Sequence, residues 1–176
     1  MTIPNLITIA RLIMVPLVIV MIGQGRWMTA FVLFLAAGVS DGVDGYIAKR
    51  FDMRSELGAY LDPLADKALL VSIYVTLSVT GVLPSWLAIT VVSRDIMIVA
   101  AIIVSRLMER PVAIKPLFIS KLNTAAQIAF AALVLGTKAF HIDATHVESA
   151  AMLVVAALTI GSAAAYLARW LRHMAA

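Results

Sequence analysis

The chain has 176 residues, of which 62% are hydrophobic and only 14% are charged. Soluble domains normally contain about 25% charged and about 45–50% apolar residues, so this composition excludes an ordinary soluble protein and predicts a chain that lies in lipid. The formal net charge of +4 would suggest nucleic acid as the partner of a soluble protein. In a membrane protein it is typical of basic residues beside anionic head groups, so we expect no nucleic-acid partner.

Six apolar segments are each long enough to cross a bilayer, which takes about 20 mostly apolar residues. The first is interpreted as a retained span, because it lacks a basic start and carries Arg11 within its apolar run, unlike a cleaved signal peptide. Glycine, proline and charged residues mark the breaks between segments. The segments cover residues 6–23, 28–48, 59–81, 84–106, 118–137 and 148–170. The sequence therefore predicts an all-α integral membrane protein with six transmembrane helices in a single domain, residues 1–176.

The distribution of lysine and arginine predicts how the chain is oriented. The second and fourth loops and the C-terminal end are rich in these residues, whereas the first, third and fifth loops together hold only Arg26 and Lys138. Because positive residues collect on the cytoplasmic side, we expect both termini and the turn between the second and third segments to be cytoplasmic. The compact chain shows no transit peptide, which favours a bacterial inner membrane over a mitochondrial one.

Four aspartates occupy the ends of the second and third segments that face this turn. Asp41 and Asp44 are three residues apart, and Asp62 and Asp66 are four apart. Residues at these spacings share one face of a helix. Asp44 lies about five residues before the turn and Asp62 about six after it, so at about 1.5 Å per residue the two pairs lie at similar depths. We expect the four carboxylates to converge just below the cytoplasmic surface.

Four carboxylates at such short distances from one another cannot all stay ionised unless positive charge compensates them. An ion pair with Lys67 could offset one of them. Divalent cations are the simpler solution, because Mg²⁺ prefers oxygen ligands and accepts substrate phosphate in its shell, and two ions could be accommodated. No histidine or cysteine lies nearby in the sequence, which disfavours zinc. The alternative of solvated loop carboxylates suits Asp52 and Glu56 better than these four, because ionisable residues near or within a membrane are commonly functional.

Small residues lie between and beside the aspartates, at Gly42, Gly45, Ala48 and Gly58. They leave room for a ligand or a neighbouring helix to approach closely. Ordinary small-residue helix packing is the alternative, but next to the carboxylates a phosphate-binding cavity is favoured.

In full, the stretch reads Asp41-x2-Asp44-Gly45-x2-Ala48-Lys49-x8-Gly58-x3-Asp62-x3-Asp66. It resembles the signature D-x2-D-G-x2-A-R-x8-G-x3-D-x3-D of the CDP-alcohol phosphatidyltransferases, with Lys49 in place of the signature arginine. Lysine keeps the charge but loses bidentate phosphate geometry, and the adjacent Arg50 could share that contact. The resemblance implies six transmembrane helices, usually in a homodimer, and a site that opens to the cytoplasm and laterally to lipid.

The resemblance also implies the roles of individual residues. Asp41, Asp44, Asp62 and Asp66 would hold two metal ions, Mg²⁺ or Mn²⁺, and Asp66 would also act as the catalytic base. The CDP-lipid would lie against Gly45, Ala48, Lys49, Ser55 and Gly58, with Asn5 and Thr8 as further contacts.

Two further stretches, "VVSRDIMIVAA" (91–101) and "KPLFISKLNTAAQI" (115–128), resemble the eukaryotic, mitochondrial-type cardiolipin synthases of this family. The resemblance implies that CDP-diacylglycerol and phosphatidylglycerol react by metal-assisted direct displacement to give cardiolipin and CMP. The nearest alternative is a phosphatidylglycerophosphate synthase, which uses glycerol 3-phosphate as the acceptor. A cation-coupled transporter is a more distant alternative, because it predicts acidic residues spread across the bilayer, whereas the four aspartates are expected at one surface. The intact set of aspartates disfavours an inactive scaffold.

The phosphate of the acceptor requires positive charge near it. Arg94 in the fourth segment and Lys121 near the start of the fifth are the candidate contacts. Arg94 could equally form a buried ion pair with Asp95 that holds helices together, and Lys121 could extend to the membrane interface. Asn123 and Gln127, four residues apart, could form hydrogen bonds between helices.

Overall fold

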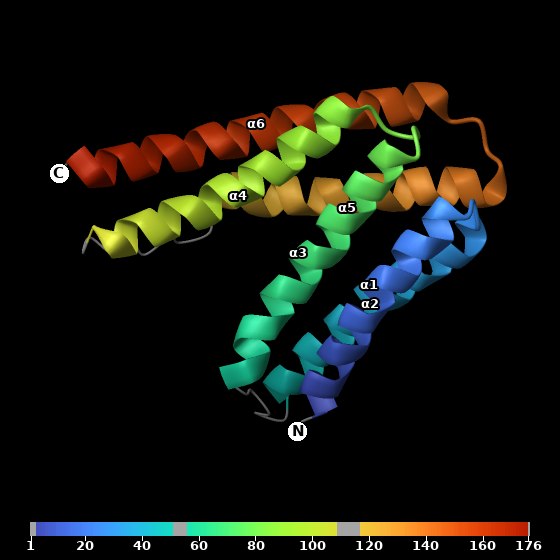
Figure 1. The fold of residues 1–176 in the computed structure, drawn as a ribbon, viewed down its shortest axis with the longest axis horizontal. Helices are drawn as coiled ribbons and strands as arrows, with labels where there is room; N and C mark the ends of the chain where they lie inside the picture. The colour runs from blue at the N-terminus through green and yellow to red at the C-terminus, as the bar shows by residue number, and fades with distance from the viewer. Residues whose placement is uncertain (1–2, 51–55, 109–116, 176) are drawn as a thin grey trace. The chain divides into compact units, whose positions relative to one another are not determined.

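The computed structural model describes the backbone of residues 3–50, 56–108 and 117–175, and their side chains except at 3–6, 43–50, 56–64, 66, 106 and 175. The described residues form six helices joined by turns (Figure 1): α1 (Ile3–Gly23), α2 (Trp27–Arg50), α3 (Glu56–Val79), α4 (Ser85–Leu107), α5 (Phe118–Phe140) and α6 (Thr145–Ala175). Each helix overlaps one predicted segment, so the prediction of an all-α chain is confirmed. Within the described residues, α4, α5 and α6 contain stretches long and apolar enough to cross a membrane. The crossing of all six helices, their orientation and the single domain stay predictions.

The chain divides into two compact units. Unit 1 comprises Met1–Leu83 and Ala131–Ala144, and unit 2 comprises Pro84–Phe130 and Thr145–Ala176. Helix α5 therefore contributes its N-terminal part to unit 2 and its C-terminal part to unit 1.

In unit 1, α1 packs against both α2 and α3. The buried residues of α1 recur at alternating spacings of three and four, which places them along one side of the helix. They are Thr8, Arg11, Val15, Val18 and Ile22. The other helices of the unit contribute the buried residues Ala30, Phe34, Ala37, Leu69, Ile73, Tyr74, Leu77, Val134 and Leu135.

Three helices of unit 1 each end in a hydrogen-bonded turn of the same type. After α1, the amides of Gly25 and Arg26 donate to carbonyl groups of the last turn at 3.0 and 2.9 Å. This is the Schellman arrangement, in which the residue after the helix adopts a positive φ. The φ angle is 70° at Gly25, 76° at Gly81 after α3, and 54° at His141 after α5. The need for a positive φ explains why glycine marks the breaks after the first and third predicted segments.

In unit 2, α4 packs against α6, and polar side chains lie in the interior beside apolar ones. Oγ1 of Thr159 on α6 donates to Oδ1 of Asn123 on α5 at 2.8 Å. Nε2 of Gln127 donates to Oγ1 of Thr159 at 3.3 Å. All three side chains are buried. The interpretation of Asn123 and Gln127 as residues that bond neighbouring helices is therefore confirmed.

Arg94 of α4 is the centre of a second buried network in unit 2. Its guanidinium lies 2.6 Å from Oδ1 of Asp95 and donates to Oγ of Ser162 on α6 at 2.8 Å. It also donates to Oγ of Ser120 on α5. The ring of Tyr166 on α6 lies 5.7 Å from the central guanidinium carbon, within the range of a cation–π contact. One side chain thus joins three helices, as the ion-pair interpretation of Arg94 expects.

Replacing Arg94 by alanine is expected to destabilise unit 2. Asp95, whose side chain is only 18% exposed, would lose this partner, and removing one member of a buried ion pair costs about 3–5 kcal/mol. Unfolding in mild detergent should show that loss for Arg94→Ala and little change for Arg169→Ala, an exposed arginine of α6. The double variant Arg94→Ala/Asp95→Ala should recover part of the loss. No recovery would contradict a role that depends on the ion pair.

Candidate functional site

The buried side of α2 leads to the first aspartate of the predicted site. Ala30, Phe34 and Ala37 are buried, and Asp41 follows Ala37 by four residues, which keeps it on the same side of the helix. Helix α1 packs against α2, and Arg11 belongs to the buried side of α1. Helical spacing and the packing of these two helices therefore bring a basic and an acidic side chain together.

Arg11 and Asp41 form an ion pair between α1 and α2. Nη1 of Arg11 lies 2.8 Å from Oδ1 of Asp41, and the side chains are 1% and 45% exposed, respectively. A buried guanidinium requires a compensating charge, which Asp41 supplies. Because almost half of the Asp41 side chain is exposed, a cation can still approach its carboxylate.

Sequence reasoning assigned no role in the site to Arg11. The signal that could have identified it is a single charged residue inside an apolar helix, because such a residue commonly has an acidic partner within the protein. The identity of that partner depends on helix packing and could not be read from the sequence.

The helices that carry the two aspartate pairs belong to the same unit. Asp41 and Asp44 lie towards the end of α2, and Asp62 and Asp66 lie near the start of α3. Helix α1 packs against both helices. Figure 1 shows the start of α1, the end of α2 and the start of α3 at one end of unit 1. The backbone is therefore compatible with a site to which all three helices contribute.

Most of the predicted site side chains lie outside the part of the chain whose side chains are described. These are Asn5, Asp44, Gly45, Ala48, Lys49, Ser55, Gly58, Asp62 and Asp66. Their convergence on metal ions and on the CDP-lipid stays a prediction. Thr8 is the described member of the predicted CDP-lipid contacts, and it is buried on α1 one turn before Arg11.

Asp41 is the motif aspartate whose surroundings the structure describes, and these bear on whether it could bind a metal ion. The described side chains include no group of three or more His, Cys, Asp or Glu residues that could hold a metal, and Asp41 is the described member of the predicted set. Its carboxylate is the kind of oxygen ligand that Mg²⁺ and Mn²⁺ favour. The residue type and the partial exposure of Asp41 both fit a metal ligand.

The two predicted acceptor contacts have different surroundings. Arg94 is buried, and its guanidinium is engaged by Asp95, Ser120 and Ser162. Lys121 is exposed near the start of α5. The contacts of Arg94 favour its role between helices, and contact of either residue with an acceptor stays a prediction.

Known proteins resemble this chain over most of its length. The sequence profile of the CDP-alcohol phosphatidyltransferases matches residues 1–164. A Schizosaccharomyces pombe cardiolipin synthase (CMP-forming) / mitochondrial hydrolase fusion protein is 35% identical, over 94% of this chain and 30% of its own length. The cardiolipin synthase (CMP-forming) of Homo sapiens is also 35% identical, over 80% of this chain and 52% of its own length.

A probable phosphatidylglycerophosphate synthase of Mycobacterium tuberculosis is 32% identical, over 97% of this chain and 82% of its own length. The chain thus spans about a third to a half of the two cardiolipin synthases and most of the mycobacterial protein. Because the family profile covers nearly all of the sequence, including the four motif aspartates, the chain belongs to the CDP-alcohol phosphatidyltransferase family.

Proposed function

We propose that the chain is a CMP-forming phosphatidyltransferase of phospholipid synthesis, and specifically a cardiolipin synthase that uses CDP-diacylglycerol and phosphatidylglycerol. The observation that carries the reaction class is the family match over residues 1–164, which spans the complete aspartate motif. The cardiolipin synthases of S. pombe and human, each 35% identical to the chain, support phosphatidylglycerol as the acceptor.

Four aspartates are proposed to hold two divalent cations, Mg²⁺ or Mn²⁺, in a family that generally uses such ions. They are Asp41, Asp44, Asp62 and Asp66. When bound, the cations neutralise the diphosphate of the CDP-lipid and stabilise CMP as it departs. Arg11 orients Asp41 through the 2.8 Å ion pair, and the exposed part of the Asp41 side chain is available to a cation.

Asp66 is proposed to act as the base. It accepts the proton of the terminal hydroxyl of phosphatidylglycerol, whose oxygen attacks the phosphorus that carries diacylglycerol. The bond from that phosphorus to the CMP oxygen breaks, so the products are cardiolipin and CMP. The CDP-lipid is positioned by Asn5, Thr8, Gly45, Ala48, Lys49, Ser55 and Gly58.

The second candidate is a phosphatidylglycerophosphate synthase, in which glycerol 3-phosphate replaces phosphatidylglycerol. The observation that favours it is the M. tuberculosis relative of that name, because the chain matches 82% of its length. The two candidates share the CDP-lipid, the metal ligands and the base, and differ in the acceptor.

We further propose that all six helices cross the membrane, that both termini and the aspartate site are cytoplasmic, and that the chain forms a homodimer in a bacterial inner membrane. The apolar helices α4, α5 and α6 support a membrane location, and the distribution of lysine and arginine supports the orientation. A mitochondrial membrane is the alternative, because the S. pombe relative is a fusion with a mitochondrial hydrolase.

An acceptor assay separates the candidate functions. Purified protein given CDP-diacylglycerol and phosphatidylglycerol is expected to release CMP and form cardiolipin, and to react far less with glycerol 3-phosphate. CMP and the lipid product can be measured by chromatography and mass spectrometry. Formation of phosphatidylglycerophosphate alone would replace the cardiolipin synthase proposal by the second candidate. The lack of CMP release with either acceptor would reopen the transporter alternative.

The variant Asp66→Asn tests the proposed base. An amide cannot accept the proton of the attacking hydroxyl, so turnover should be almost lost while part of the binding of metal and CDP-diacylglycerol is retained. CMP release and binding of labelled CDP-diacylglycerol measure the two properties. Asp52→Asn, at a position that the motif leaves unspecified, is the matched control and should stay active. Near-normal turnover of Asp66→Asn would refute the assignment.

The variant Arg11→Met tests whether the ion pair orients Asp41. Methionine keeps an apolar side chain of suitable length in the buried position but leaves Asp41 without this guanidinium. Loss of a residue that orients a metal ligand typically costs about 10–100-fold in metal affinity or activity. We therefore expect a higher Mg²⁺ concentration for half-maximal activity, with Arg26→Met, an exposed arginine of the α1–α2 turn, as the control. Unchanged metal dependence in a folded Arg11→Met protein would limit the pair to a structural role.

A further inference from the structure

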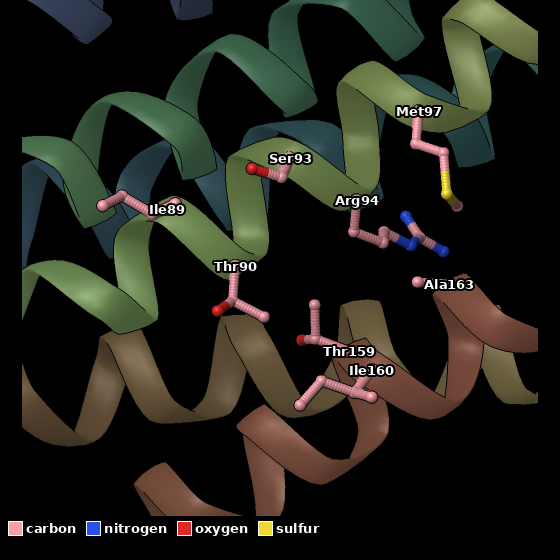
Figure 2. Close-up of a pocket in the computed structure, with 8 residues that line it drawn as sticks. All are labelled: Ile89, Thr90, Ser93, Arg94, Met97, Thr159, Ile160 and Ala163. Atoms are coloured by element: carbon pink, nitrogen blue, oxygen red, sulfur yellow. The ribbon is translucent and has the colours of Figure 1, made fainter.

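Unit 2 contains a groove between α4 and α6 whose lining includes none of the motif aspartates. Its volume is about 440 Å³. Figure 2 shows the guanidinium of Arg94 between α4 and Ala163 of α6. The lining residues are Ile89, Thr90, Ser93, Arg94, Met97, Thr159, Ile160 and Ala163.

The groove lies in the first half of α4 and at the centre of α6. On α4 it extends over residues 89–97 of the helix Ser85–Leu107. At about 1.5 Å per residue, it begins about 6 Å after the start of the helix and ends about 15 Å before its last residue. On α6 it involves residues 159–163 of the helix Thr145–Ala175, near the centre. Both helices are long and apolar enough to cross a membrane, and if they do cross it, these positions lie within the hydrocarbon core.

The charged group that lines the groove, the guanidinium of Arg94, is engaged within the protein. The charge of Arg94 is compensated by Asp95, and its other contacts are with Ser120 and Ser162. An anionic head group would therefore meet a guanidinium that is already neutralised and hydrogen-bonded. This arrangement disfavours a phosphate or carboxylate ligand at the groove.

The two threonines of the groove are engaged in the same way. Oγ1 of Thr90 donates to the carbonyl of Trp86 at 2.7 Å, and Oγ1 of Thr159 donates to Asn123 at 2.8 Å. Ile89 and Ile160 are 63% and 60% exposed, so they present hydrocarbon to the surroundings. Met97 adds a flexible apolar wall that can adapt to an irregular ligand.

We propose that this groove holds one acyl chain of a membrane phospholipid. The head group of a phospholipid stays at the membrane surface, so its acyl chain is the part that reaches these positions of α4 and α6. A seated chain contacts the apolar side chains of the groove and requires no hydrogen bond from Arg94 or the two threonines. The proposal does not depend on which acceptor the protein uses.

The experiment uses the full chain in phosphatidylcholine vesicles that contain a trace of phosphatidylcholine with a photoreactive diazirine midway along one acyl chain. After illumination, mass spectrometry locates the label. The expected result is enrichment on residues 89–97 and 159–163 relative to exposed apolar residues elsewhere, such as Leu153. Ala163→Phe, which fills the groove, should lower this labelling several-fold. Ala164→Phe, at the exposed neighbouring position on α6, should leave it unchanged.

Ile160→Phe is the second filling variant, and it keeps the test usable if Ala163→Phe fails to fold, because position 160 is mostly exposed. It should also lower the labelling of residues 89–97. Label spread evenly over exposed apolar residues, or unaffected by both filling variants, would overturn the proposal. The chain contains no cysteine, so Ala163→Cys gives a single thiol. Efficient disulfide-linked dimers of that variant would show that a second copy covers the groove, which would also overturn the proposal.

Discussion

Charge compensation inside apolar helices is the constraint on which the rest of this structure depends. Arg11 and Arg94 both lie within apolar helices and are almost completely buried. A buried charge without a partner is destabilising by several kcal/mol. Each arginine is therefore compensated by an aspartate, at 2.8 Å for Arg11 with Asp41 and 2.6 Å for Arg94 with Asp95. The packing of α1 against α2 provides the first pair, whereas the second is formed by adjacent residues of α4.

The two ion pairs differ in how far their carboxylates are exposed. This difference favours a structural role for the Arg94 pair and a ligand-binding role for the Arg11 pair. The side chain of Asp95 is 18% exposed, and Arg94 is also bonded to serines of two other helices. That network is closed and serves to hold unit 2 together. The side chain of Asp41 is 45% exposed. An aspartate that is oriented from one side and accessible from the other suits the metal-ligand role proposed for it.

The closed network also determines which ligand the groove of unit 2 can accept. Because the guanidinium and the threonine hydroxyls are engaged inside the unit, the groove offers mainly apolar contacts. Polar groups thus join the helices from within, while the surface that faces lipid stays compatible with hydrocarbon. A hydroxyl or amide that is bonded between helices avoids the penalty of an unsatisfied polar group in the membrane.

The sequence by itself determined the features that depend on local chemistry. The length of each apolar segment predicts a helix, and the glycines at positions 25 and 81 have the positive φ that a Schellman turn requires. The spacing of the aspartates within Asp41–Asp66 indicates the family and the chemistry of its site. Helix ends were less well predicted, because α6 continues to Ala175 beyond the apolar segment 148–170. A helix can extend with polar residues past the stretch that hydrophobicity detects.

Only the tertiary structure decided which distant side chains meet. The partner of Arg11 lies in the next helix, and Ser120 and Ser162, which bond Arg94, are 26 and 68 residues away in the chain. Spacing within a helix defines which residues share a face, but it does not define how that helix is rotated against its neighbours. The same reason applies to the groove, whose two walls come from α4 and α6. Contacts between helices depend on rotation and packing, which local sequence patterns do not specify.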